Sequence, residues 1–250
     1  MTNTTNSGPA FSSIPFRVGA ATSRTFEIFF AGFGRLFVLA LIPMIPLLVI
    51  ALSGAQPAGV GAAMFSFKDA IVTVVGFVLG TVANATVLFG VFEIMRGESF
   101  TIGQSLRVGL ARTLPVCGVS IVAGIATGLA MIALIVPGFI VLCMLYVAVP
   151  ACVIEKLGVG GSLSRSAALT KGYRWPIFGL LLIFTILAWV VGYAGTSLVR
   201  SMGGGMLAVF EFGWQVIATA FGAVLSAVIY HDLRVAKEGV DISKLANVFD

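Results

Sequence analysis

Between two long apolar runs of this chain lies the stretch EKLGVGGSLSRSAALTKGYRW, residues 155–175. It carries four basic side chains against a single acidic one, Glu155. The apolar runs on both sides are too long for a soluble core, so the stretch is predicted to be a loop between two membrane spans. A basic loop in this position is typical of the cytoplasmic side of a membrane.

Composition predicts that the whole chain is an integral membrane protein. Hydrophobic residues make up 59% of the chain and charged residues only 10%, which is incompatible with a water-facing globular surface. The net charge of +5 comes from bases in short loops, so it indicates membrane topology and anionic headgroups rather than nucleic acid. The cysteines, Cys117, Cys143 and Cys152, fall in or beside apolar runs without a CxxC pair, and we interpret them as packing residues.

The apolar runs predict an all-α fold, a polytopic membrane bundle of six transmembrane helices with interfacial amphipathic helices. The predicted spans are residues 36–52, 70–95, 114–136, 139–153, 176–198 and 206–230. Amphipathic patterns that begin at Phe16 and cover residues 100–113 predict short helices lying in the membrane interface. Pro137 and Gly138 predict a tight turn between the third and fourth spans.

The basic residues predict the orientation of the chain. All except Lys68 and Arg200 fall on one side of the predicted spans, so both termini are expected to be cytoplasmic, in a bacterial inner membrane. The membrane domain is then residues 16–236. Residues 1–15 are expected to be a disordered cytoplasmic tail and residues 237–250 a cytoplasmic C-terminal tail.

Three junctions that follow the second, fourth and sixth spans resemble one another. Each has an acid at the end of a span, then a base, a glycine, and a serine followed within two residues by a leucine. This pattern predicts a three-fold repeat of helical hairpins, each preceded by a short amphipathic helix that we call its lead-in helix. A carboxylate at the C-terminal end of a helix is unfavourable against the helix dipole, so each acid is expected to have a cationic partner. The structural ion-pair candidates are Glu93, Arg96, Glu155, Lys156, Asp232 and Arg234.

A sharper hypothesis makes these junctions a site for lipid headgroups or other anions. Basic and hydroxyl side chains gather near the start of the lead-in helices, where backbone N–H groups favour negative charge. The lipid-binding or anion-binding candidates are Arg107, Arg112, Ser162, Ser164, Arg165, Lys171 and Arg174.

Two quoted stretches carry a family resemblance: IVPGFIVLCMLYVAVPACVIEKLGVGGSLSRSAALTKGYRWPIFG, residues 135–179, and YHDLRVAKEG, residues 230–239. They resemble the membrane domain attached to some bacterial glycerophosphoryl diester phosphodiesterases. The resemblance implies a six-span bundle, here expected to be free-standing. The phosphodiesterase activity of those proteins belongs to a separate barrel with paired histidines, and this chain has one histidine, His231. The resemblance therefore implies no enzymatic activity.

The residues themselves also predict no enzyme, no cofactor and no metal site. Acids are scattered at span ends with only His231 beside them, and the chain has no Walker loop, GxSxG elbow or dinucleotide fingerprint. The predicted span centres carry no ionisable residue, whereas ion-coupled carriers usually place ionisable residues near the bilayer midplane. Asn84 and Gln215 are expected to form hydrogen bonds between helices, and the spacing Gly76/Gly80 is expected to allow close helix packing.

The leading functional hypothesis is a scaffold or accessory subunit that contacts lipid headgroups, another membrane protein or a second copy of itself. The alternative is a lipid or small-anion transporter whose basic cytoplasmic vestibule is framed by Glu93, Glu155, Asp232 and the nearby arginines. An enzyme acting on lipid phosphoesters through His231 is third.

Overall fold

The computed structural model of the chain describes residues 16–53, 67–202 and 204–238. Within these ranges every regular element is a helix, and six helical segments are long and apolar enough to cross a membrane. The fold is therefore the predicted all-α membrane bundle with six spans. The tail predicted over residues 1–15 and most of the tail predicted over residues 237–250 lie outside the described ranges.

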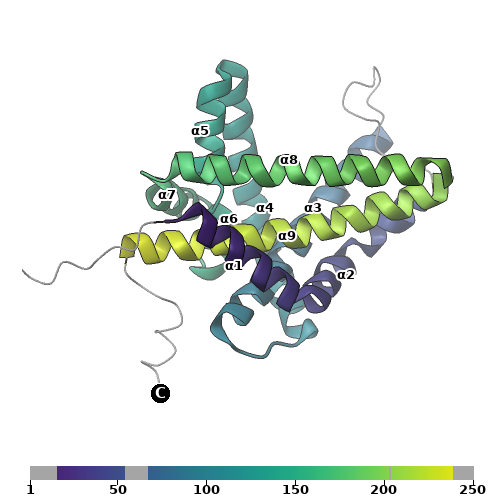
Figure 1. The fold of residues 1–250 in the computed structure, drawn as a ribbon, viewed down its shortest axis with the longest axis horizontal. Coiled ribbons are helices and arrows are strands. Elements are labelled where there is room, and N and C mark those ends of the chain that lie inside the picture. Colours follow the sequence, from purple (N-terminus) through teal and green to yellow (C-terminus); the bar gives the residue numbers. More distant parts are fainter. Residues whose placement is uncertain (1–15, 54–66, 203, 239–250) are drawn as a thin grey trace, which may run out of the picture.

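Three hairpins follow one another along the chain (Figure 1). In the first, α2 pairs with α3; in the second, α4 pairs with α5 and α6, which together make the fourth span; in the third, α8 pairs with α9. The helices are α1 (Val18–Ala31), α2 (Phe33–Leu52), α3 (Phe67–Arg96), α4 (Ile102–Ala133), α5 (Ile135–Leu145), α6 (Ala148–Ile154), α7 (Val159–Thr170), α8 (Arg174–Val199) and α9 (Gly204–Glu238), with a short 3-10 turn, η1 (Arg200–Met202), before α9.

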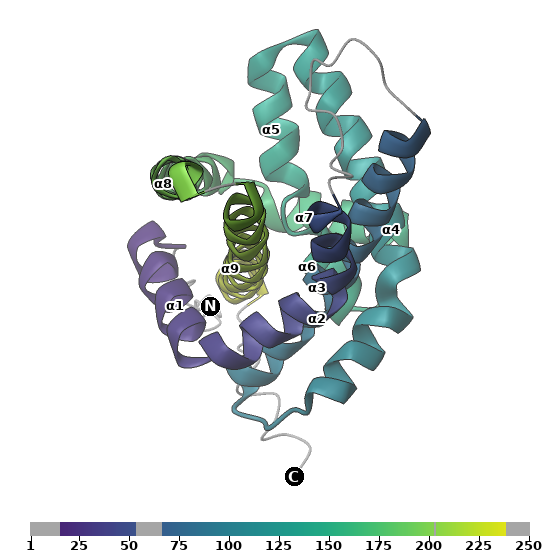
Figure 2. The ribbon, with the colours of Figure 1, turned by 90° about the vertical axis from the view of Figure 1, so that its right-hand side faces the viewer.

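The hairpins diverge instead of running parallel. Helices α8 and α9 lie side by side, while the hairpin of α4 and α5 stands at a steep angle to them (Figure 1). When α8 and α9 are seen end-on, α4 and α5 still lie across the view (Figure 2). Helix α9 is central, because it contacts α1, α2, α3, α6, α7 and α8.

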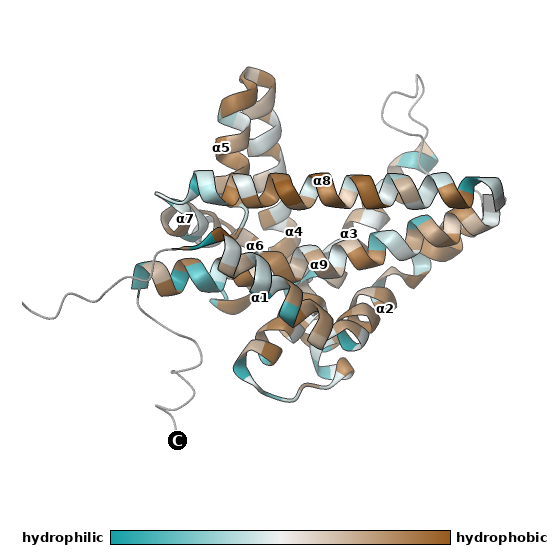
Figure 3. Cartoon of the chain, in the orientation of Figure 1, coloured by the Kyte–Doolittle hydropathy of each residue, from teal (hydrophilic) through white to brown (hydrophobic). Residues whose placement is uncertain are grey.

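The core surrounds α9, which packs against α1, α2 and α3 as well as α6, α7 and α8. We call the end of this core formed by α6, α7, residues 223–238 of α9 and the adjoining parts of α1 and α3 the joint. Every residue from 223 to 230 is buried, so this part of α9 is covered on all sides. Large apolar side chains away from the joint are exposed, as at Ile132 on α4 and Trp189 on α8. Brown ribbon is prominent along α8 and at the free end of the α4/α5 hairpin in Figure 3. Apolar surface in a bilayer faces apolar lipid, so these side chains need no protein packing.

The amphipathic helix expected from Phe16 is α1, and its buried face rests on the protein. Ala21, Thr25 and Phe29 are buried in this helix, and the Phe29 ring meets Phe221 of α9 edge to face, with centroids 5.2 Å apart. Aromatic rings prefer this arrangement. Helix α1 is thus part of the core as well as a lead-in to the first hairpin.

The separate interfacial helix predicted over residues 100–113 is wrong. Thr101 caps a helix by accepting a hydrogen bond from the Gln104 backbone N–H at 3.3 Å, and that helix, α4, continues through Pro115 to Ala133 without a break. By contrast, the boundary between α7 and α8 contains Gly172, which has φ +91°. No residue from 102 to 113 takes a left-handed conformation. These residues therefore continue directly into the membrane-spanning part of α4.

The turn predicted at Pro137 and Gly138 lies three residues earlier. Leu134 has an extended backbone, φ −162° and ψ 140°, and both predicted turn residues belong to α5. Proline is tolerated in the first turn of a helix, where no intrahelical acceptor exists for its missing N–H. Gly138 has a packing role, since a Cβ there would lie 2.5 Å from the Met131 side chain of α4.

Candidate functional site

Helix α7 is bounded by sharp changes of chain direction at both ends. Lys156 before it has φ 56° and Gly172 after it has φ +91°, and both values fall in the left-handed region that residues with a Cβ seldom adopt. These turns fold the segment from Glu155 to Trp175 back against α5 and α6, which precede it, and against α9.

A hydroxyl group of α7 pairs with a backbone carbonyl that the neighbouring helix leaves free. Helix α5 ends at Leu145 and α6 begins at Ala148, and the carbonyl of Met144 accepts a hydrogen bond from Ser166 Oγ at 2.7 Å. Thr170 Oγ1 lies 3.3 Å from the same carbonyl, but its shorter bond, 2.9 Å, goes to the Ser166 carbonyl. Carbonyls in the last turn of a helix lack an intrahelical donor. The break in the fourth span is therefore stabilised by the buried face of α7.

Arg165 is the centre of an ionic cluster at the joint. Its Nε lies 2.8 Å from Glu155 Oε1, and its Nη1 lies 2.5 Å from Glu238 Oε1 at the end of α9. Tyr230 donates its phenolic hydroxyl to the same Glu155 oxygen at 2.5 Å. The hydrogen bond to Glu238, followed by that to Glu155, raises the pKa of Arg165 above its ordinary value against the opposing effect of burial. The cluster ties α7 and the turn before it to α9.

The ion-pair candidates pair differently from the sequence prediction in two of three junctions. Glu93 and Arg96 do pair, with 3.6 Å between Arg96 Nη1 and Glu93 Oε1. Glu155 pairs with Arg165 across a helix, while Lys156 is exposed. Each acid thus has the expected cationic partner, but the partner of Glu155 is not the adjacent base, because the left-handed turn at Lys156 is followed by a helix that brings Arg165 back to Glu155.

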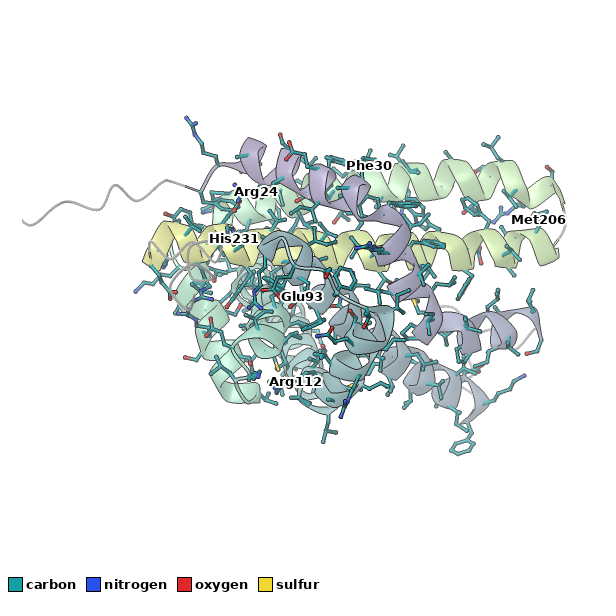
Figure 4. The ribbon with its side chains drawn as sticks, turned by 90° about the horizontal axis from the view of Figure 1, so that it is seen from below. Arg24, Phe30, Glu93, Arg112, Met206 and His231 are labelled. Atoms are coloured by element: carbon teal, nitrogen blue, oxygen red, sulfur yellow. The ribbon has the colours of Figure 1, made fainter. Side chains whose placement is uncertain are left out.

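The third junction is also held by a distant residue. Asp232 forms an ion pair with Arg24 of α1 and lies 3.3 Å from His231 Nδ1, whereas Arg234 pairs with Glu238, one helical turn later, at 3.2 Å. Figure 4 shows Arg24, His231 and Glu93 towards one end of the molecule, with Met206 at the opposite end. The serine of the third junction, Ser243, lies outside the described residues.

Several lipid-binding or anion-binding candidates are not available as ligands. Ser162 is fully buried and its hydroxyl donates to the Gly158 carbonyl at 2.9 Å, and Arg165 is occupied by two carboxylates. Ser164 is exposed on α7, while Arg107 is exposed and Arg112 half-buried on α4. These residues do not form one site together.

The two remaining candidates, Lys171 and Arg174, come together at a groove between α5 and α8. The groove has a volume of about 450 Å³, and its lining is Val136, Phe139, Ile140, Cys143, Lys171, Gly172, Arg174, Trp175 and Phe178. One end is thus apolar and the other carries two cations. Arg174 Nε is buried and has no hydrogen-bond acceptor among the described residues, although a buried donor normally has one.

Sequence reasoning missed Tyr230, Glu238 and Arg24 as members of the joint. The sixth span was expected to end at residue 230, but α9 continues to Glu238 and carries that carboxylate to Arg165. The spacing of Arg234 and Glu238, four residues apart, is the signal that could have indicated a continuing helix. Arg24 could not be found in this way, because its partner is 208 residues away.

Residues 67–231, from the start of α3 into α9, match a family described as a domain of unknown function, DUF7847. The chain belongs to this family. The DUF7847 region includes α7, both sides of the α5/α8 groove, and Glu155, Arg165 and Tyr230 of the ionic cluster, whereas α1 and α2 precede it. No curated protein and no solved structure matches the chain.

Proposed function

We propose that this chain is a non-enzymatic membrane scaffold or accessory subunit that holds an anionic phospholipid in the groove between α5 and α8. We place it in the bacterial inner membrane with both termini cytoplasmic. In support, Lys68 and Arg200 are the only basic residues at the far ends of the hairpins within the described ranges, and basic residues favour the cytoplasmic side.

The observation that carries the lipid proposal is the position of Arg174 in the groove. Its buried Nε lacks an acceptor, and Lys171 lines the same end of the groove. A lipid phosphate supplies acceptor oxygens and negative charge, which match a guanidinium and an ammonium group. The phosphate would therefore satisfy the unpaired donor.

The rest of the groove suits the apolar part of a phospholipid. Phe139, Ile140 and Phe178 line it beyond the cations, and burial of an acyl chain against them needs no polar partner. Trp175, with 75% of its surface exposed, lies at the start of α8, as is typical of aromatic residues at the membrane–water interface.

The test is retention of lipid by the full chain. The protein is purified in mild detergent, incubated with phosphatidylglycerol or phosphatidylcholine, and examined by native mass spectrometry. We expect phosphatidylglycerol to be retained in preference to phosphatidylcholine. The double variant Lys171→Gln/Arg174→Gln should lose about tenfold or more of this preference, since charge-assisted hydrogen bonds contribute about 1.5–3 kcal/mol each.

The matched control is Arg107→Gln/Lys156→Gln, which removes two exposed cations elsewhere. It should leave retention unchanged. Equal loss in both double variants would reduce the effect to net charge and would overturn the groove as the site.

We favour the scaffold over the transporter alternative because the arginines at the joint are already paired with acidic residues. Arg24, Arg96 and Arg165 are each held in an ion pair with an acid, so they are poorly placed to pass an anion along. The accessory role predicts that a partner membrane protein or a second copy co-purifies in mild detergent. A chain that always emerges as a bare monomer would count against it.

We also propose that the chain shares its architecture with the membrane domain of glycerophosphoryl diester phosphodiesterases, which residues 135–179 resemble. Those residues contain both cations of the groove and its apolar wall on α5. A phosphate-bearing lipid is the ligand that this shared segment would hold.

A further inference from the structure

A second hollow lies at the place where α3, α4 and α9 face one another, with a volume of about 360 Å³. Its polar lining comes from Thr81, Asn84, Ser120, Gln215 and Thr219, and none of its lining residues is charged. It shares no residue with the α5/α8 groove. The two sites are therefore physically separate.

The hollow is at the middle of its helices. Asn84 lies near the centre of α3 (Phe67–Arg96), Ser120 near the centre of α4 (Ile102–Ala133) and Thr219 near the centre of α9 (Gly204–Glu238). These three helices are membrane spans, so their centres fall in the hydrocarbon region. No bulk water is available there to satisfy polar groups.

One polar atom in the hollow lacks a partner. Asn84 Oδ1 is buried and accepts no hydrogen bond among the described residues. The two threonine hydroxyls are already used as donors within their own helices, from Thr81 to the Phe77 carbonyl at 2.7 Å and from Thr219 to the Gln215 carbonyl at 2.8 Å. A carboxamide left unpaired in hydrocarbon is costly, so a ligand that forms a hydrogen bond with Asn84 would relieve this cost.

The wall of the hollow leaves room for an apolar body. Gly80 and Gly222 both line it, and a Cβ added at either residue would meet no atom within 4 Å. These glycines therefore do not serve close packing inside the chain. A charged ligand would be unpaired, because the lining has no side chain of opposite charge.

We propose that this hollow binds an uncharged lipid alcohol that enters from the bilayer, with its hydroxyl on Asn84 and its hydrocarbon along the glycine wall. A hydroxyl both donates and accepts, so it satisfies the carboxamide whichever of its two ends faces the hollow. An apolar body adds burial against the helices without a new polar requirement.

The test uses the full chain in lipid nanodiscs and a matched pair of photoreactive probes. One probe is a diazirine-bearing octanol and the other the corresponding diazirine-bearing octane, which lacks the hydroxyl. After irradiation, labelled peptides are mapped by mass spectrometry. The alcohol should label peptides of α3, α4 and α9 around the hollow saturably, and at least about fivefold more than the alkane, as one hydrogen bond of about 1 kcal/mol requires.

Two variants and one control assign the label to the hollow. Asn84→Leu removes the hydrogen-bonding group, and Gly80→Leu fills the space while leaving Asn84 intact; each should lower alcohol labelling by about fivefold or more. Gly124→Leu adds the same side chain on α4 where a Cβ also meets nothing within 4 Å, outside the lining, and should leave labelling unchanged. Gly80→Leu keeps the test decisive if Asn84→Leu fails to fold.

Three results would overturn the proposal. The first is equal labelling by both probes, and the second is labelling that neither Asn84→Leu nor Gly80→Leu reduces. The third is a cross-link between two copies of the chain through Gly80→Cys, which would make the hollow a helix-docking surface. Because the α5/α8 groove shares no lining residue with the hollow, loss of alcohol labelling and loss of phosphatidylglycerol retention are independent outcomes.

Discussion

Tyr230 of α9 donates its hydroxyl to Glu155 Oε1 at 2.5 Å, and the two residues are 75 positions apart in the chain. The Tyr230 ring is fully buried and meets Phe92 of α3 edge to face, with centroids 5.9 Å apart. This one side chain therefore connects the third hairpin to the turn before α7 and to the first hairpin. Through its contacts with Glu155 and Phe92, Tyr230 links three parts of the chain at the joint.

Tyr230→Phe should destabilise the protein by about 1.5–3 kcal/mol, because it removes a hydrogen bond to a charged group while keeping the ring in place. The measurement is thermal or denaturant unfolding in detergent micelles. Tyr193→Phe is the control, since Tyr193 is 68% exposed on α8. Equal unfolding midpoints for both variants would show that the hydroxyl of Tyr230 contributes nothing particular to the joint.

Arg165→Met should lower the free energy of unfolding by about 2 kcal/mol, because it leaves two carboxylates without their shared cation. The value is below that of a fully buried pair, since the Arg165 side chain is 24% exposed. Adding Glu155→Gln to Arg165→Met should recover part of the loss, because one uncompensated charge is removed. Lys156→Met, at an exposed neighbouring cation, should be nearly neutral; a similar loss there would contradict the assignment.

Gly109→Ala should disrupt the contact between α3 and α4. The new Cβ would lie 2.1 Å from Thr86 Oγ1 and 3.1 Å from the Thr86 Cα, so backbone as well as side chain must move, at a cost of about 1–3 kcal/mol. Gly103→Ala is the matched control on the same helix, because its Cβ meets nothing within 4 Å. It should be neutral or stabilise α4 by about 0.5–1 kcal/mol. The prediction fails if both variants unfold alike.

Gly172→Ala should destabilise the turn from α7 to α8 by about 1–2 kcal/mol. The strain comes from φ +91° and not from crowding, since no atom lies within 4 Å of the added Cβ. Because Gly172 separates Lys171 from Arg174 in the groove, phosphatidylglycerol retention should fall as well. Gly179→Ala, in α8 with open space at its Cβ, should leave phosphatidylglycerol retention unchanged and should be neutral or stabilising by about 0.5–1 kcal/mol.

The proposed orientation of the chain predicts which serines are accessible from outside the cell. Ser164 on α7 and Ser201 at the far end of the third hairpin are both exposed. In a background with Cys117, Cys143 and Cys152 replaced, a membrane-impermeant maleimide added to spheroplasts should label Ser201→Cys. It should label Ser164→Cys only after the membrane is permeabilised. The reverse pattern would invert the proposed topology.

The six spans were predictable because hydropathy is a local property. An apolar run of sufficient length must be a helix in a bilayer whatever its neighbours do, since each backbone group needs an internal partner. Boundaries were less predictable. Residues 100–113 joined the span that follows them, whereas α7 stayed separate from α8, at a boundary with an extended Lys171 and a left-handed Gly172.

The candidate site was predictable only as a region. Residues 155–175 were singled out by their charge, and two of the seven predicted ligands, Lys171 and Arg174, do line a groove. Which cations are free depends on which carboxylates come within reach after folding. Arg165 pairs with Glu238 at the end of α9. Glu155 pairs with Arg165 and not with its neighbour Lys156.

By itself, therefore, the amino-acid sequence determined that this chain is a helical membrane protein with six spans and a basic stretch at residues 155–175, because span length and charge are read from consecutive residues. Only the tertiary structure decided which contacts the side chains of this stretch make. Contacts between residues far apart in the chain set Arg165 as the structural centre of the joint, and they left Arg174 with an unpaired donor at an apolar groove.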